Sequence, residues 1–365
     1  MKKFFAILLC LCMIFAMVAC DTDKGDNKDD QNNAATEAEY KLGMGIVVDL
    51  NSSATGNAQV DATVATVVLD AAGKIVVCRI DAVQNKMNVT DGAVDTAATF
   101  QTKMEKGDAY GMAAAVNYGM DWNGDGVVKE WYDQAKAFEA YVVGKTVAEV
   151  EAIQTKVVEG AGYVIAADEA LLSAGCTIQI TDFIAAVAKA CKDDQGMTFK
   201  TAETFTLGVA AKSAVDSATV AATADADGLV AMYSDFAAAV IAGGKIIATL
   251  NDAIQPKITI NVAGEIVAKA YTATKRELKE GYNMATYGAS MDPNGDGRVL
   301  EWYLQSEAFS KHVVGMTGAE VAAMTTATNS IGYQMTTDAD LLAAGCTIQI
   351  TAITAVVAQA AANAR

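Results

Sequence analysis

The sequence predicts an α+β protein made of two homologous domains in tandem, each a small antiparallel sheet with packed helices. Three observations support this fold class. The chain has 365 residues, of which 52% are hydrophobic, enough for about two domains of roughly 100–200 residues each. Long segments of the chain recur once. Within each copy, stretches rich in Val, Ile and Thr precede a helical pattern.

The N-terminus has the pattern of an export signal. Lys2 and Lys3 are followed by an apolar run from Phe4 to Ala19, which is shorter than the roughly 20 residues of a membrane span. The junction Met17-Val-Ala-Cys20 resembles a bacterial lipobox, in which the cysteine becomes the mature N-terminus and carries lipid. We therefore expect a lipoprotein signal peptide at 1–19 and lipidation at Cys20. An ordinary signal or an uncleaved anchor is the alternative.

The segment after the lipobox is expected to be a tether. Residues 20–39 begin with Cys20 and are then rich in Asp, Asn, Lys and Gln, with almost no apolar side chain. Such a composition predicts a flexible acidic segment. The folded part would thus be held by its lipid anchor on the outer face of the cell membrane, in an extracellular location.

Two groups of motifs define the repeat. Asp121-Trp-Asn-Gly-Asp-Gly126 recurs 171 residues later as Asp292-Pro-Asn-Gly-Asp-Gly297, and Glu-Trp-Tyr follows each copy. Gly175-Cys-Thr-Ile-Gln-Ile-Thr181 recurs 170 residues later as Gly345-Cys-Thr-Ile-Gln-Ile-Thr351. A period of this length indicates two complete domains rather than a solenoid. A charged, glycine-containing stretch near 192–201 places the domains at residues 40–195 and 196–365.

The strands of each unit are predicted from composition and turn residues. The expected strands are Ala62–Leu69 and Lys74–Ile80 in the first unit, and Lys245–Leu250 and Lys257–Val262 in the second. They are rich in β-branched residues and separated by turn residues, as antiparallel strands are.

The helices are predicted from the spacing of apolar side chains. The ranges 130–150 and 301–321 show helical spacing. Thr177–Thr181 alternates like a strand, with Thr177, Gln179 and Thr181 on one face. An alanine-rich helix then closes the unit, with Thr181 or Asp182 as the expected N-cap.

Charge and histidine content exclude some functions. The chain has 44 acidic and 27 basic side chains, a net charge of −17, so no nucleic-acid partner is expected. His312 is the only histidine, which excludes a Ser/His/Asp triad in each domain and any multi-histidine metal site.

The cysteines of the folded part do not suggest a disulfide framework. Those that remain after the leader and Cys20 are Cys78, Cys176, Cys191 and Cys346, and they are not placed symmetrically in the two units. We expect them to be mostly free, as in a reducing or anaerobic habitat.

The Asp-x-Asn-Gly-Asp-Gly loops resemble calcium loops. Oxygen-bearing side chains at alternate positions with glycine sixth match the start of an EF-hand loop, but the glutamate comes tenth instead of twelfth, as in short extracellular calcium loops. A tight turn without metal is the alternative. The candidate Ca²⁺ ligands are Asp121, Asn123, Asp125 and Glu130 in the first loop and Asp292, Asn294, Asp296 and Glu301 in the second.

The second repeated motif is Ala-Gly-Cys-Thr at 174–177 and 344–347. From the residues alone, it can be a glycine turn that leads into a strand with a buried cysteine. It can also be a modification site, because a hydroxyl can take a phosphodiester link and glycine lets a phosphate approach the backbone.

Further motifs carry a family resemblance. Glu-Trp-Tyr-x-Gln-x-x-Ala-Phe begins at Glu130 and Glu301, Val-Val-Gly-x-Thr follows it, and Thr274-Lys-Arg-Glu277 and Tyr282-Asn-Met284 precede the second copy. Over most of residues 40–365 the chain resembles the repeated domains of Gram-positive extracellular electron-transfer flavoproteins of the pheromone-lipoprotein type. In these proteins two such domains follow a lipidated cysteine.

The resemblance implies covalent FMN, attached through its phosphate by a dedicated FMN transferase to a threonine in a Ser/Ala-Gly-Ala-Thr-like motif. Carried onto this chain, the attachment points are Thr177 and Thr347, giving two FMN groups per chain. Gly175, Cys176, Gly345 and Cys346 complete the two cofactor-binding motifs. The tryptophans of the Glu-Trp-Tyr motifs, together with Tyr163 and Tyr333, are candidates to stack on the flavin ring, or else core aromatics.

The expected function is that of an extracytoplasmic electron carrier rather than a catalyst with its own substrate. As the resemblance implies, electrons would come from a membrane quinol oxidoreductase or another donor and pass to soluble flavins, metal oxides or other extracellular acceptors. The alternative is a calcium-stabilised surface lipoprotein with a ligand-binding or cell-wall role and no redox cofactor.

Overall fold

The structure, a computed structural model, describes residues 36–114, 121–122, 124, 126–284, 286, 292, 297, 299–329 and 332–365. The predicted signal peptide, Cys20 and most of the predicted tether lie outside the described residues. Residues Glu37–Arg365 form one compact unit. The first strand begins at Ala38, two residues before the predicted start of the first domain.

Along the chain, a group of strands is followed by helices, two short strands and further helices, and this order occurs twice. The strands are β1 (Ala38–Asp49), β2 (Asn57–Asp70), β3 (Ile75–Thr90), β4 (Ala93–Val94), β5 (Thr155–Val157), β6 (Val164–Ala166), β7 (Met197–Thr201), β8 (Thr206–Val215), β9 (Gly228–Ala242), β10 (Lys245–Ile254), β11 (Lys257–Ile260), β12 (Ile266–Ala270), β13 (Thr326–Thr328) and β14 (Gln334–Thr336). The α-helices are α1 (Lys103–Lys106), α2 (Trp131–Val142), α3 (Val147–Glu151), α4 (Glu169–Ser173), α5 (Thr181–Cys191), α6 (Lys275–Leu278), α7 (Trp302–His312), α8 (Gly318–Ala322), α9 (Ala339–Ala343) and α10 (Thr351–Ala362), with 3₁₀ turns η1 (Gly107–Tyr110) and η3 (Lys279–Tyr282).

Two antiparallel sheets form the centre of the unit. The first has the order β4-β3-β2-β1-β7, and the second has the order β10-β9-β11-β12 with β8 also paired to β9. The predicted strands lie within or overlap β2, β3, β10 and β11, so these predictions are confirmed. The antiparallel α+β class is confirmed with them.

The two sheets share a hydrophobic core. Leu42, Val60 and Val83 of the first sheet belong to the same buried cluster as Val209 and Val230 of the second. The strand that follows the predicted domain boundary, β7, also pairs with β1 of the first sheet. The ranges 40–195 and 196–365 therefore share this core, and each also has a buried cluster of its own between its sheet and its helices.

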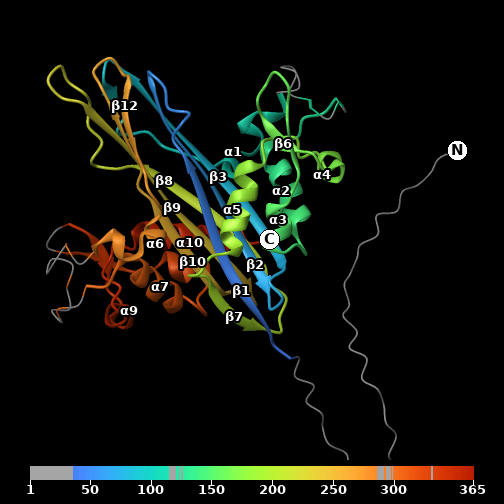
Figure 1. The fold of residues 1–365 in the computed structure, drawn as a ribbon. Helices are drawn as coiled ribbons and strands as arrows, with labels where there is room; N and C mark the ends of the chain where they lie inside the picture. The colour runs from blue at the N-terminus through green and yellow to red at the C-terminus, as the bar shows by residue number, and fades with distance from the viewer. Residues whose placement is uncertain are drawn as a thin grey trace, which may run out of the picture. The chain divides into compact units, whose positions relative to one another are not determined.

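Helices cover the outer face of each sheet. Figure 1 shows α2 and α5 beside β1–β3, and α7 and α10 beside β8–β10. The helix α5 lies so close to β1 that a Cβ atom on Gly43 would stand 2.1 Å from the carbonyl oxygen of Ala190. In the second sheet a Cβ on Gly208 would stand 1.9 Å from the carbonyl oxygen of Ala360 in α10. Glycine is required at both positions for this close approach.

The long predicted helices are each broken in two. The first ends at Val142 and resumes as α3, and the second ends at His312 and resumes as α8. Gly144 and Gly315 adopt φ values of +82° and +88° in the breaks. The amide of Gly144 donates to the carbonyl of Ile75 in β3 (2.7 Å), so the chain leaves the helix to bond to the sheet edge.

Two predictions about the segment before the last helix of the first unit are wrong. Thr177–Thr181 is not a strand, and Thr177 and Ile180 are both buried while Gln179 is exposed. The helix α5 begins at Thr181, and its N-cap is Ile180, which makes no side-chain capping bond. In the second repeat, Ile350 is likewise the N-cap residue of α10.

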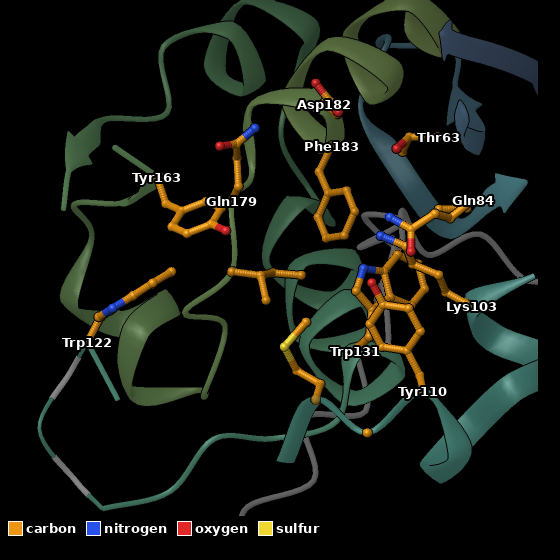
Figure 2. A pocket seen from close by; sticks show the side chains of 14 residues that line it. Thr63, Gln84, Lys103, Tyr110, Trp122, Trp131, Tyr163, Gln179, Asp182 and Phe183 are labelled. Atoms are coloured by element: carbon orange, nitrogen blue, oxygen red, sulfur yellow. The ribbon is translucent and has the colours of Figure 1, made fainter. Parts of the chain in front are cut away.

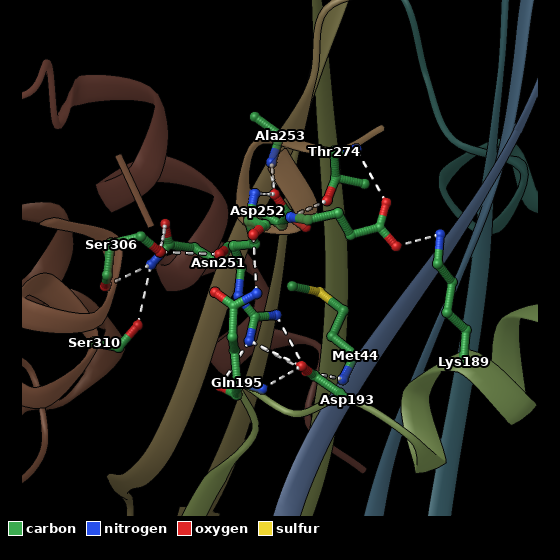
Figure 3. A network of polar contacts seen from close by, with 12 residues as sticks. Met44, Lys189, Asp193, Gln195, Asn251, Asp252, Ala253, Thr274, Ser306 and Ser310 are labelled. Carbon is green, nitrogen blue, oxygen red and sulfur yellow. Dashed lines mark hydrogen bonds and ion pairs between the residues drawn. The ribbon is translucent and has the colours of Figure 1, made fainter. Parts of the chain in front are cut away.

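A buried polar network joins the two halves of the chain (Figure 3). Both Asp193 carboxylate oxygens lie 3.2 Å from the Arg276 guanidinium, and one of them also accepts the Met44 amide at 3.1 Å. The Arg276 guanidinium also donates to the Gln195 carbonyl (2.7 Å). Asp193 and Arg276 are each 7% exposed, so the pair is shielded from water. It fixes α6 of the second half against β1 of the first.

The free cysteines agree with the sequence prediction: Cys78, Cys176, Cys191 and Cys346 are unbridged. In the described part of the chain, no helix has both the length and the apolar character needed to span a bilayer.

Candidate functional site

Both Ala-Gly-Cys-Thr motifs form the turn that ends a short helix. Gly175 follows α4 with φ of +86°, and Gly345 follows α9 with φ of +89°. The Gly175 amide donates to the Leu172 carbonyl (2.8 Å) and the Cys176 amide to the Leu171 carbonyl (3.1 Å). These bonds satisfy carbonyls at the helix C-terminus, where glycine is the usual residue in the left-handed conformation. The glycine thus has a structural reason in each motif.

The two threonine hydroxyls are buried and hydrogen-bonded. Thr177 and Thr347 are each 2% exposed. The Oγ1 of Thr177 lies 3.3 Å from the Oε1 of Gln134, and that of Thr347 lies 3.3 Å from the Oε1 of Gln305. Both proposed attachment points are therefore closed to a large enzyme while this turn keeps the described conformation.

Gln134 and Gln305 hold the turns, a role that the sequence analysis missed. In the first half, Gln134 Oε1 also accepts the amides of Thr177 (2.8 Å) and Ile178 (3.0 Å), and Nε2 donates to the Lys129 carbonyl (2.7 Å). Gln305 makes the same set of bonds in the second half. The available signal was the shared glutamine of the repeated Glu-Trp-Tyr-x-Gln motif.

The cysteines of these motifs face the interior. Cys176 and Cys346 are fully buried. Burial raises the pKa of both thiols to about 12. At neutral pH both stay protonated, so they are poor nucleophiles and poor metal ligands.

The predicted calcium loops are described only in part. Asp121 accepts the amides of Gly124 (3.0 Å) and Gly126 (2.8 Å), and Asp292 accepts the amide of Gly297 (2.7 Å). Glu130 and Glu301 are the N-cap residues of α2 and α7. The predicted ligands Asn123, Asp125, Asn294 and Asp296 lie outside the described residues.

The two glutamates bond to nearby backbone. Glu130 accepts the amides of Met112 and Ala113 at 2.9 Å each, and Glu301 accepts that of Met284 at 2.9 Å. Within the described ranges, His, Cys, Asp and Glu side chains form no group of three or more suited to a metal. The calcium sites stay a prediction from the sequence.

A cavity of about 580 Å³ lies between the first sheet, η1 and α5, beside the first Ala-Gly-Cys-Thr turn (Figure 2). Ile178 and Gln179, which directly follow Thr177, contribute to its wall. The volume lies in the range of about 300–1,000 Å³ that is usual for small-molecule sites. Its aromatic walls are Tyr110, Trp122, Trp131, Tyr163 and Phe183.

The aromatic side chains of the cavity are ordered by contacts with one another. Trp122 and Tyr163 have ring centroids 5.1 Å apart, and Trp131 meets Phe183 edge-on at 5.7 Å. The Lys103 ammonium lies 5.2 Å from the ring centroid of Tyr110 and 5.5 Å from that of Trp131. These distances are within the range of cation–π attraction. The walls thus offer both ring faces and a positive charge.

Polar groups also reach the cavity. Thr63 and Gln84 come from the sheet, Gln179 from the segment before α5 and Asp182 from the first turn of α5. Burial raises the pKa of Asp182, with a further contribution from the Asp49 carboxylate. A flat aromatic ligand with hydrogen-bonding edges fits this combination of ring faces and amide and carboxylate groups.

Comparisons with known proteins give one limited match. No family model matches the chain, and no solved structure matches it. A chlorophenol reductase of Desulfitobacterium hafniense is 35% identical over 103 residues. The match covers 24% of this chain and 29% of that protein, so the chain spans under a third of the length of this relative.

Proposed function

We propose that this chain is an extracytoplasmic, lipid-anchored electron-transfer flavoprotein whose two halves are homologous FMN-binding repeats. FMN would be attached covalently to Thr177 and Thr347, and lipid to Cys20. The observation that carries the proposal is the aromatic cavity, whose wall includes Ile178 and Gln179, the two residues directly after Thr177.

The cavity residues fit a flavin ring. The side chains of Tyr110, Trp122, Trp131 and Tyr163 provide faces for stacking, and Gln84 provides an amide for the polar edge of the ring. Lys103 provides a positive charge beside two of the ring faces. Bound FMN would supply the redox chemistry, while these residues would hold its ring and exclude water.

The attachment threonine needs one local change. In the closed turn Thr177 Oγ1 is bonded to Gln134, so the hydroxyl must leave this contact before it can take a phosphodiester link. The proposed partners are an FMN transferase, a membrane quinol oxidoreductase or another electron donor, and soluble flavins or metal oxides as acceptors. The chain itself would act as a carrier of electrons without a substrate of its own.

The proposal is tested by expressing the full chain with and without an FMN transferase. Intact mass should rise by two FMN groups only with the transferase, and the yellow colour should survive denaturation. Thr177→Ala with Thr347→Ala should abolish the added mass. The matched control is Thr181→Ala with Thr351→Ala, which changes nearby threonines that the proposal does not use. An unchanged mass gain in the first double variant would show that attachment occurs elsewhere.

The burial of both hydroxyls favours a second candidate. A calcium-stabilised surface lipoprotein that binds an aromatic ligand or a wall component, without a redox cofactor, leaves Thr177 and Thr347 in their closed turns. The same expression experiment separates the two functions. A full-length chain that gains no mass beside an active transferase supports this second candidate.

A further inference from the structure

The repeat allows each residue of the aromatic cavity to be compared with its counterpart in the second half. Most of the wall is retained: Lys103, Tyr110, Met112, Trp131, Tyr163, Ile178 and Gln179 correspond to Lys275, Tyr282, Met284, Trp302, Tyr333, Ile348 and Gln349. The Lys275 ammonium lies 5.2 Å from the ring centroids of both Tyr282 and Trp302. The distances from the Lys103 ammonium to its two ring centroids agree with this value within a few tenths of an ångström.

Five wall residues differ between the halves. The counterparts of Thr63, Gly111, Trp122, Asp182 and Phe183 are Asp235, Asn283, Pro293, Ala352 and Ile353. The second half therefore lacks two of the aromatic side chains and the Asp182 carboxylate, and its own carboxylate, Asp235, comes from the sheet and lies near Lys275. Ile353 is buried in the helical core of its half.

The lost groups are those that complete the first cavity. Phe183 meets the Trp131 ring edge-on, and Trp122 pairs with Tyr163, so both help to fix the ring faces on opposite walls (Figure 2). Asp182 supplies a partly buried carboxylate, a group that can accept hydrogen bonds from the edge of a ligand. An isoleucine, a proline and an alanine provide neither stacking surface nor an acceptor.

We propose that the two halves are functionally unequal, and that the first-half cavity binds a planar fused aromatic ring without any covalent link, while its second-half counterpart binds such a ring at least tenfold more weakly. Trp122, Asp182 and Phe183 are the residues that make the difference. The choice of an isoalloxazine ring rests on the proposed function, but binding at this cavity does not require attachment at Thr177.

Tryptophan positions make the two halves separately observable. The chain has three tryptophans, of which Trp122 and Trp131 line the first cavity and Trp302 is in the second half. Riboflavin, which has no phosphate for a transferase, is titrated into the full chain made without transferase. Binding is followed by tryptophan quenching and by equilibrium dialysis. We expect one saturable equivalent per chain, and quenching that persists in Trp302→Phe.

Exchange variants test the named residues. Asp182→Ala with Phe183→Ile should weaken riboflavin binding at least tenfold. If this double variant does not fold because the buried phenylalanine is needed, Asp182→Ala alone is used, and it should weaken riboflavin binding about threefold. Circular dichroism and a urea midpoint confirm that each variant is folded. Ile353→Val is the matched control in the second half and should leave binding unchanged.

The outcomes separate this inference from the proposed function. Two equivalents of equal affinity, unchanged affinity in the folded Asp182→Ala variant, or no saturable binding would each overturn the inequality of the halves. Riboflavin binding at one equivalent, together with no mass gain beside the transferase, would support the inequality and reject covalent attachment. Mass gain at both threonines with no selective riboflavin binding would support covalent attachment and reject the inequality of the halves.

Discussion

Replacing Gln134 with leucine tests whether its carboxamide satisfies the buried turn around Thr177. Leucine is of similar size but offers no hydrogen bond, so the amides of Thr177 and Ile178, the Thr177 hydroxyl and the carbonyl of Lys129 lose their partner. An unpaired buried polar group costs about 1–3 kcal/mol. Because Ile178 is only partly buried and Lys129 is exposed, water can reach two of these groups. We therefore expect the free energy of unfolding to fall by about 2–6 kcal/mol, the sum for the two buried groups of Thr177.

The assay is urea unfolding of the full chain, followed by circular dichroism and tryptophan fluorescence. Gln305→Leu should give a loss of similar size, since Gln305 makes the same bonds. Gln101→Leu is the control at an exposed glutamine and should stay within about 0.5 kcal/mol of the parent. A loss below about 1 kcal/mol for both buried glutamines would refute the reasoning that these carboxamides satisfy the turns.

Three further predictions follow from buried charge and from the loops. Burial raises the pKa of Asp81 to about 7. Asp81 therefore stabilises the folded state below the unfolded pKa of about 4, and this stabilisation is lost as pH rises through 7. In urea unfolding experiments, Asp81→Asn should lower the free energy of unfolding by less at about pH 8 than at about pH 5. Arg276→Met leaves Asp193 buried without its cation and should lower the unfolding free energy by about 3–5 kcal/mol, and a loss under about 1 kcal/mol would contradict a buried pair. If the loops bind Ca²⁺, the ion at 100 times its Kd should add about 2.7 kcal/mol per site, and calorimetry should show no such gain in Asp125→Ala with Asp296→Ala.

The elements that composition and turn residues define were predictable. The strands within β2, β3, β10 and β11 need only β-branched residues between turns, and the helix starts at Trp131 and Trp302 follow from apolar spacing. The helix breaks were not predicted, although Gly144 and Gly315 were visible. Their cause is a bond from the glycine amide to the carbonyl of Ile75 or Ile246, which lies about 70 residues earlier in the chain and has no local signature.

The sequence pattern also does not predict how the two repeats pack against each other. A strand that is apolar on both faces, such as β2 with Val60 and Val67 in different clusters, fits a sheet covered on both sides. Its pattern does not say whether the cover is a helix of the same repeat or the sheet of the other. In the structure each sheet has helices on one face and the other sheet on the opposite face.

The candidate site shows the same limit. The sequence singled out Thr177 by its motif, yet the nature of its surroundings depends on Gln134, 43 residues away, and on the aromatic side chains of Tyr110, Trp122 and Phe183, which come from separate elements. Only Trp131 and Tyr163 were named from the sequence. Repetition of the glutamine in both halves was the one signal for its role.

The bonds of Gln134 also decide how a modified threonine must sit. A phosphodiester on Thr177 removes the hydroxyl hydrogen, so Oγ1 can no longer donate to Gln134 Oε1 and the two oxygens repel at the present 3.3 Å. The carboxamide cannot flip to present Nε2 without breaking its bonds to the amides of Thr177 and Ile178 and to the Lys129 carbonyl. Rotation of the threonine side chain gives up the longest of these contacts and keeps the shorter ones. We therefore expect the flavinylated protein to retain the Gln134 bonds to backbone, with Thr177 in a different χ1 rotamer. A crystal structure of that protein in which Gln134 has left the backbone amides would refute this account.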